Sequence, residues 1–286
     1  MTTDEAVTVL AAALGGAALA SLLAMARLAA PPQSLMRVNH RGATVPAVLG
    51  GPLVIGGLST LAVVAMAGAA GWEPGRVGRI GLTLAVVSGV MFVAGAWDDR
   101  RGDEADRGFG GHLEALRGGR LTGGVMKIVA GLFAAGAAFA LLASAEDVSS
   151  SHLVALALLV PATANLFNLL DRAPGRTGKV GLVMGVALIV LGNTAWAIAA
   201  AGSLGALVAL LGKDLGERAM LGDAGSNPLG AVLGLGLGLS LRGPGLWIAL
   251  GLVIVLNGLS EKVSFSAVIE RTPVLRALDG WGRIRE

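Results

Sequence analysis

The 286-residue chain contains no cysteine and no tyrosine, and only 14% of its residues are charged. Without cysteine it can form no disulfide, thiolate nucleophile or zinc-thiolate site. Its three histidines, His40, His112 and His152, are scattered along the chain, so any metal site must be built from oxygen ligands. The low charge leaves too little polar surface to cover a soluble globule of this size.

Long apolar stretches dominate the chain instead, because 54% of its residues are hydrophobic. A helix needs roughly 20 apolar residues to cross a bilayer. Nine such spans are expected, at about 6–26, 52–71, 80–97, 125–145, 153–170, 180–191, 194–211, 226–241 and 245–259. The sequence therefore predicts an all-α, polytopic integral membrane protein with about nine to ten transmembrane helices, forming one domain over 1–286 with a cytoplasmic C-terminal segment at 259–286.

The stretch 180–211 decides the topology of everything that follows it. It is short for two spans and long for one. Gly192 and Asn193 in its middle favour a tight turn between two helices, whereas a single tilted helix would reverse the downstream orientation.

Basic residues predict the orientation. If the N-terminus lies outside, 19 of the 22 Lys and Arg residues lie on the cytoplasmic side, and only Arg76, Arg79 and Arg242 lie outside. The C-terminus is then cytoplasmic. Because the basic balance of +3 acts as a topology signal, no nucleic-acid partner is expected. Arginine outnumbers lysine 18 to 4, as in GC-rich bacterial genomes, so the expected location is a bacterial plasma membrane.

Acidic residues gather at the cytoplasmic ends of the predicted spans. Asp98 and Asp99 follow the third span, Asp171 ends the fifth and Asp223 opens the eighth. Ionisable residues at membrane depth are costly and mark function by default. The Asp98–Asp99 pair can share a divalent cation or hold a proton at a raised pKa, with a solvated charge run as the alternative. Lys127, two residues into the fourth span, is either a phosphate ligand and partner of these acids or a side chain that snorkels to the interface.

Two further segments suggest ligands for a substrate. Asn165, Asn168 and Asp171 recur every third residue and share one side of a helix, which is either a binding face or an interhelical hydrogen-bonding stripe. The segment 222–226 lies at the expected start of a helix, where free amides attract phosphate and an Asp can hold a cation. The alternative for this segment is an ordinary Asp or Ser N-cap.

The first cytoplasmic loop is basic and is punctuated by glycine and proline. Its side chains Arg37, His40 and Arg41 contact either an anionic substrate or lipid headgroups. The sequence leaves both interpretations open.

In their order along the chain, these motifs resemble the polyprenyl-phosphate N-acetylhexosamine-1-phosphate transferase family. That family includes phospho-N-acetylmuramoyl-pentapeptide transferase and the N-acetylglucosamine-1-phosphate transferases. The resemblance extends over about 37–281 and rests on four elements: Ala43-Thr44-Val45-Pro46 with the glycines that follow to Gly51, the pair Asp98-Asp99, the spaced set Asn165, Asn168 and Asp171, and Gly222-Asp223-Ala224-Gly225-Ser226.

The resemblance implies an Mg²⁺-dependent reaction at the cytoplasmic membrane face. A sugar-1-phosphate would pass from a UDP-N-acetylhexosamine to a polyprenyl phosphate, releasing UMP, in cell-envelope glycan synthesis such as that of peptidoglycan. Asp223 would be the principal magnesium ligand with Asp98, which would also bind or deprotonate the lipid phosphate, and Asp99 would support it. Substrate contacts would come from Asn165, Asn168, Asp171, Lys127, Arg41, Gly222, Gly225 and Ser226. An apolar groove between helices would hold the isoprenoid.

The chain departs from the family pattern in two places. After Asp171 the family usually continues with a second acid between glycines, whereas Arg172 to Gly175 follow here. The family's late cytoplasmic loop carries a histidine cluster, but this chain has no histidine after His152. The segments 260–266 and 271–281 replace that loop, with an amphipathic helix on the membrane surface as one interpretation.

Two other functions and one further partner stay open. The first alternative is a catalytically inactive family member that binds a lipid phosphate or a nucleotide sugar and acts in assembly. The second is a secondary transporter, whose intramembrane Asn and Asp residues would have the same appearance. Small residues over Gly230 to Gly238 would permit a homodimer.

Overall fold

A computed structural model describes residues 2–39, 41–73, 75–101, 122–143, 146 and 148–284. Within this part of the chain the fold consists of eleven α-helices, one 3₁₀ turn (Gln33–Leu35) and a two-stranded hairpin. The helices are α1 (Thr3–Ala29), α2 (Gly50–Ala69), α3 (Gly75–Arg101), α5 (Gly123–Leu142), α6 (Ser150–Leu170), α7 (Arg176–Val190), α8 (Thr194–Leu215), α9 (Asp223–Ser240), α10 (Gly243–Ser260), α11 (Phe265–Arg271) and α12 (Pro273–Gly280). The strands are β1 (Met36–Val38) and β2 (Thr44–Pro46).

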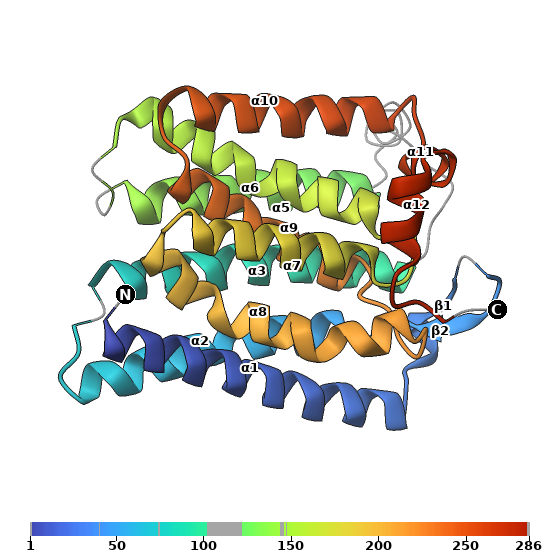
Figure 1. Ribbon diagram of the computed structural model, residues 1–286, viewed down its shortest axis with the longest axis horizontal. Coiled ribbons are helices and arrows are strands. Elements are labelled where there is room, and N and C mark those ends of the chain that lie inside the picture. The colour runs from blue at the N-terminus through green and yellow to red at the C-terminus, as the bar shows by residue number, and fades with distance from the viewer. Residues whose placement is uncertain are drawn as a thin grey trace.

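The nine helices from α1 to α10 run alternately up and down through one bundle (Figure 1). Each coincides with one of the nine predicted apolar spans. Seven of them are long and apolar enough to cross a membrane, namely α1, α2, α3, α5, α6, α8 and α10. The chain is thus an all-α protein of the multi-pass membrane type.

The predicted break in 180–211 is confirmed. Helix α7 ends at Val190, Gly192 adopts a left-handed φ of 85°, and α8 starts at Thr194. Asn193 stabilises the turn, because its side chain accepts a hydrogen bond from the Trp196 amide and donates one to the Leu239 carbonyl. Two helices therefore replace the single tilted helix that the alternative required.

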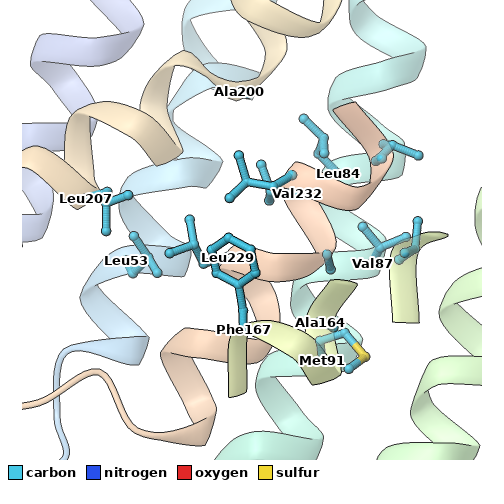
Figure 2. Close-up of a cluster of buried hydrophobic side chains, with 14 of the residues drawn as sticks. Leu53, Leu84, Val87, Met91, Ala164, Phe167, Ala200, Leu207, Leu229 and Val232 are labelled. Atoms are coloured by element: carbon cyan, nitrogen blue, oxygen red, sulfur yellow. The ribbon is translucent and has the colours of Figure 1, made fainter. Parts of the chain in front are cut away.

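Helix α9 is the centre of the bundle. It packs most closely on α6 and α3, and nearly all its residues are buried. Figure 2 shows the apolar side chains around it: Leu229 and Val232 of α9 lie among Phe167 and Ala164 of α6, Leu84, Val87 and Met91 of α3, Leu53 of α2, and Ala200 and Leu207 of α8. A helix surrounded in this way can be apolar on all sides.

The glycines of α9 serve this internal packing. A Cβ at Gly230 would collide with the backbone of α6 at Thr163 and Ala164, and one at Gly236 would collide with Trp196 of α8. Gly234 and Gly238 also face α6. The prediction that Gly230 to Gly238 offers a dimerisation face is therefore wrong, because these residues are covered within the chain.

The hairpin β1–β2 lies across the end of the bundle at which α3, α6 and α8 finish (Figure 1). Backbone hydrogen bonds attach it to the loop before α9, from the Met220 amide to the Pro46 carbonyl (3.0 Å) and from the Leu49 amide to the Met220 carbonyl (3.2 Å). Helices α11 and α12 lie at the same end, whereas α1 begins at the opposite end.

Candidate functional site

One end of the bundle contains a cavity of about 500 Å³. It is lined by side chains from the hairpin, from the ends of α3, α6 and α8, and from the starts of α5 and α9. The polar lining residues are Arg37, Asn39, Asp98, Asp99, Lys127, Asn168, Asp171, Arg172, Asp214, Glu217 and Asp223. The predicted gathering of carboxylates at one end of separate helices is confirmed.

Lys127 connects two of these carboxylates. Its ammonium group lies 2.7 Å from Asp98 Oδ2 and also forms an ion pair with Asp223. Gly123, one turn earlier on α5, leaves room for this arrangement, because a Cβ at that position would collide with the Asp98 carboxylate. Lys127 is thus a partner of the acids, and the snorkelling interpretation does not apply to it.

Asp99 fixes the start of α9. Its two carboxylate oxygens accept hydrogen bonds from the amides of Asp223 (3.0 Å) and Ala224 (2.9 Å), and its residue exposure is only 8%. Gly222 precedes the helix with a φ of 64°, and a Cβ there would press on the Asp99 carboxylate. The N-cap is therefore supplied across space by α3 and not by a side chain of segment 222–226.

This capping corrects a prediction about phosphate. The amides of Gly225 and Ser226 bond to the Gly222 carbonyl, and those of Asp223 and Ala224 bond to Asp99. All four amides of the first turn are occupied, so the expected free amides at this helix start are absent. Gly222 lines the cavity, whereas Gly225 and Ser226 lie beneath it, buried against neighbouring helices.

The two asparagines of α6 have different roles. Asn168 lines the cavity and donates to the Asp223 carboxylate and to Ser226 Oγ (3.3 Å). Asn165 lies outside the cavity lining and donates to Asn257 Oδ1 of α10 (2.6 Å), which in turn donates to the Ala162 carbonyl of α6 (3.0 Å). For Asn165 the structure therefore shows the interhelical alternative, because Asn257 of the neighbouring α10 bonds to it.

Asp171 and Asp214 form a second acidic part of the same cavity. Asp171 follows the last residue of α6, and Asp214 near the end of α8 is 5% exposed and accepts the Gly175 amide (3.1 Å). Burial raises the pKa of the Asp171 carboxyl well above its ordinary value, and the charges of Asp214 and Asp223 raise it further. A protonated Asp171 can donate a hydrogen bond to an anion that it would otherwise repel.

Glu217 holds the hairpin over this cavity. Its carboxylate accepts a hydrogen bond from the side-chain Nδ2 of Asn39 and forms an ion pair with Arg41 (3.1 Å). Its φ of 50°, the only left-handed value among the described non-glycine residues, belongs to the turn that ends α8, in which the Arg218 amide bonds to the Lys213 carbonyl and the Glu217 amide to the Asp214 carbonyl. Arg41 itself lies at the rim, outside the lining, while Arg37 lines the cavity. His40 lies outside the described residues.

Sequence reasoning missed Asp214, Glu217 and Asn39 as site residues. A signal for Asp214 was present, since it lies three residues after a predicted span, while Asp98 and Asp171 directly follow theirs. The ion pair of Glu217 with Arg41, by contrast, joins residues 176 positions apart, and no local sequence pattern predicts it.

The charge balance of the cavity decides which ligands it suits. Its described lining has six carboxyl groups and three basic side chains, Arg37, Lys127 and Arg172. Because the carboxyl groups outnumber the basic side chains, a cation that entered with a phosphate group would reduce the repulsion between them. No group of three or more acidic or histidine side chains in the described residues is placed to hold a metal by itself. Mg²⁺, however, is commonly held by one or two carboxylates and completed by substrate phosphates, and Asp98 with Asp223 already share one cation, the Lys127 ammonium.

No protein-family model and no curated protein matches the chain. The fold and cavity define it as a polytopic α-helical membrane protein with a buried acidic site at one end of its bundle.

Proposed function

We propose that the protein transfers a sugar-1-phosphate of the N-acetylhexosamine type from a UDP-sugar to a polyprenyl phosphate, releasing UMP. One observation carries this proposal. Residues from three separate motifs, at Asp98–Asp99, Asn168–Asp171 and Gly222–Asp223, line one cavity although up to 125 positions separate them. The same motifs carry the resemblance to the polyprenyl-phosphate transferases.

The proposed setting is a bacterial plasma membrane, with the cavity on the cytoplasmic side. Nine crossings by α1 to α10 would leave the N-terminus outside and the C-terminal helices in the cytoplasm. The distribution of Lys and Arg supports this orientation, since 19 of 22 would lie on the inner side. Both substrates, a nucleotide sugar from the cytoplasm and a lipid from the inner leaflet, would then reach the same cavity, as cell-envelope glycan synthesis requires.

In the proposed reaction an oxygen of the polyprenyl phosphate bonds to the sugar-bearing phosphorus of the UDP-sugar, while the bond from that phosphorus to the UMP oxygen breaks. Asp98 binds the lipid phosphate and takes its proton when it arrives protonated. Lys127 offsets the negative charge that gathers on the phosphates. Asn168 and Asp99 hold Asp223 in place from two sides, by hydrogen bonds to its carboxylate and to its amide.

Mg²⁺ is the proposed cofactor, with Asp223 and Asp98 as its protein ligands. When bound, it would neutralise phosphate charge and polarise the phosphorus–oxygen bonds. The acidic balance of the lining supports this assignment, because the three basic side chains there do not compensate the carboxyl groups.

The test is UMP release from a panel of UDP-N-acetylhexosamines with undecaprenyl or decaprenyl phosphate, with and without Mg²⁺. Asp223→Asn and Asp98→Asn are each expected to abolish turnover, while Asp4→Asn, a matched change on the exposed start of α1, leaves it intact. Turnover retained in both site variants would refute the proposal. The absence of UMP release with every UDP-sugar of the panel, from protein shown to be folded, would also refute it.

One observation favours a second candidate, a catalytically inactive protein that binds the same lipid phosphate or nucleotide sugar. The Lys127 ammonium lies against both carboxylates that would hold the metal. If it stays there, phosphate binds without metal. Ligand-dependent thermal stabilisation that is equal with and without Mg²⁺, and no UMP release, would select this candidate.

A further inference from the structure

The C-terminal helices α11 and α12 have an apolar side that nothing in the described chain covers. Neither helix contains a buried residue. On α12, Val274 is 68% exposed and Leu278 is 59% exposed, and Trp281 directly after the helix is 76% exposed. Successive residues of a helix are about 100° apart, so these three positions share one side.

The opposite edge of this segment is fixed to the bundle. Arg176, itself only 5% exposed, donates to both carboxylate oxygens of Asp279 (2.8 and 2.9 Å) and to Ser266 of α11 (2.9 Å). Lys179 donates to carbonyls at the end of α12, including those of Leu278 and Trp281. The segment is therefore held in one orientation, with its apolar side away from these contacts.

The apolar side of α12 lies close to the exposed apolar surface of α10. Helix α10 buries Leu246, Leu250 and Val253 towards the bundle, and its other side exposes apolar residues as far as Leu259. Only four residues then separate α10 from α11, among them the exposed Val263. In Figure 1 the two short helices lie at the end of α10 and run across the direction of the long helices. If α10 crosses the membrane, this end of it lies where a bilayer changes from acyl chain to headgroup.

We infer that α11 and α12 lie in the headgroup–acyl boundary of the membrane, with Val274, Leu278 and Trp281 inserted among the lipids. The lipid surface is the occupant because the apolar strip is continuous with α10 and ends in an exposed tryptophan, which prefers this boundary. Charge contributes little. The segment 261–284 contains four basic and three acidic residues. The inference does not depend on the proposed enzymatic activity.

The absence of native cysteine makes a direct test available. Leu278→Cys and Arg276→Cys, two residues apart and on opposite sides of α12, are each labelled with a nitroxide in proteoliposomes of phosphatidylethanolamine and phosphatidylglycerol. Collision of the label with oxygen, which concentrates in lipid, is compared with collision with a water-soluble nickel chelate. The ratio of oxygen to nickel collision is expected to be several-fold higher at 278 than at 276. Val274→Cys should repeat the result at 278 and serves where Leu278→Cys fails to fold.

Three outcomes would overturn the inference. Equal ratios at 278 and 276 would place the apolar side in water. Dipolar broadening between labels at 278 would show a second copy of the chain as the occupant. A ratio at 278 that falls to the value at 276 in purely zwitterionic vesicles would show that charge, and not apolar burial, holds the segment to the membrane.

Discussion

Exchanging Asp99 for asparagine tests the through-space cap on α9. The carboxylate accepts two amide hydrogen bonds with its two oxygens, whereas an asparagine has one acceptor and presents an NH₂ group to the second amide. Hydrogen bonds to a charged group contribute about 1.5–3 kcal/mol each, and a buried amide without a partner adds a penalty. The expected loss is about 2–4 kcal/mol, equivalent to roughly 3–7 °C in melting temperature for a chain of this size.

The measurement is thermal unfolding of purified protein in one detergent, with Asp98→Asn as the matched control. That variant removes the same charge at the neighbouring position but leaves Lys127 paired with Asp223. Its melting temperature is expected to fall by less than half as much. Equal shifts for the two variants, or a larger shift for Asp98→Asn, would refute the assignment of Asp99 as the cap.

Three further predictions follow from single contacts. Gly123→Ala is expected to reduce UMP release roughly 10²-fold, because the added Cβ would push Asp98 away from Lys127. The control is Gly136→Ala on the same helix, where a Cβ meets nothing within 4 Å and UMP release should be unchanged. Equal activities of the two variants would contradict the close contact between Gly123 and Asp98. Asn257→Ala is expected to lower the melting temperature by a few degrees and to retain turnover, since interhelical hydrogen bonds in membranes contribute about 0.6–2 kcal/mol. Lost turnover with an unchanged melting temperature would instead indicate that Asn165 acts in the site. Burial alone would raise the pKa of Asp279, but the hydrogen bonds and charge of Arg176 lower it below its ordinary value of 3.8. The docking of α12 should therefore persist at neutral pH and weaken as the pH falls below about 3.8, measured as increased mobility of a nitroxide at 278; mobility that rises instead on going from pH 7 to pH 9 would contradict this ion pair.

The bundle could be predicted from the sequence because each long helix corresponds to a continuous apolar stretch of neighbouring residues. Every predicted apolar span coincides with a helix, and Gly192 with Asn193 marked the break that sets the order of the later helices. Asp98, Asp171 and Asp223 were identified as site residues by their position at the ends of spans. Such features depend only on neighbouring residues.

Other features depend on contacts between distant segments, and the sequence did not reveal them. The amides at the start of α9 were expected to be free for phosphate, but Asp99 reaches them from a helix 124 positions away. Asn165 and Asn168 share a motif, yet the neighbouring α10 supplies Asn257 to the first of them only. Periodicity states which residues share a side of a helix, but not which neighbour that side meets.

The packing of α9 also bears on how the cavity can work. Its first turn is held by Asp99, and a Cβ at Gly95 of α3 or at Gly50 of α2 would collide with its backbone at Asp223 or Ala224. Asp223 therefore sits on a segment that cannot shift without disturbing three helices. Lys127 and Arg37 reach the cavity on long, flexible side chains, so these two cations would make the movement that admits the proposed phosphate ligand. A site of this kind keeps its carboxylates fixed and rearranges its positive charges. Such a site suits either exchange of the Lys127 ammonium for a divalent cation or direct binding of phosphate by Lys127. Ligand binding that depends on Mg²⁺ would indicate the exchange, and ligand binding that is independent of Mg²⁺ would indicate direct binding by Lys127.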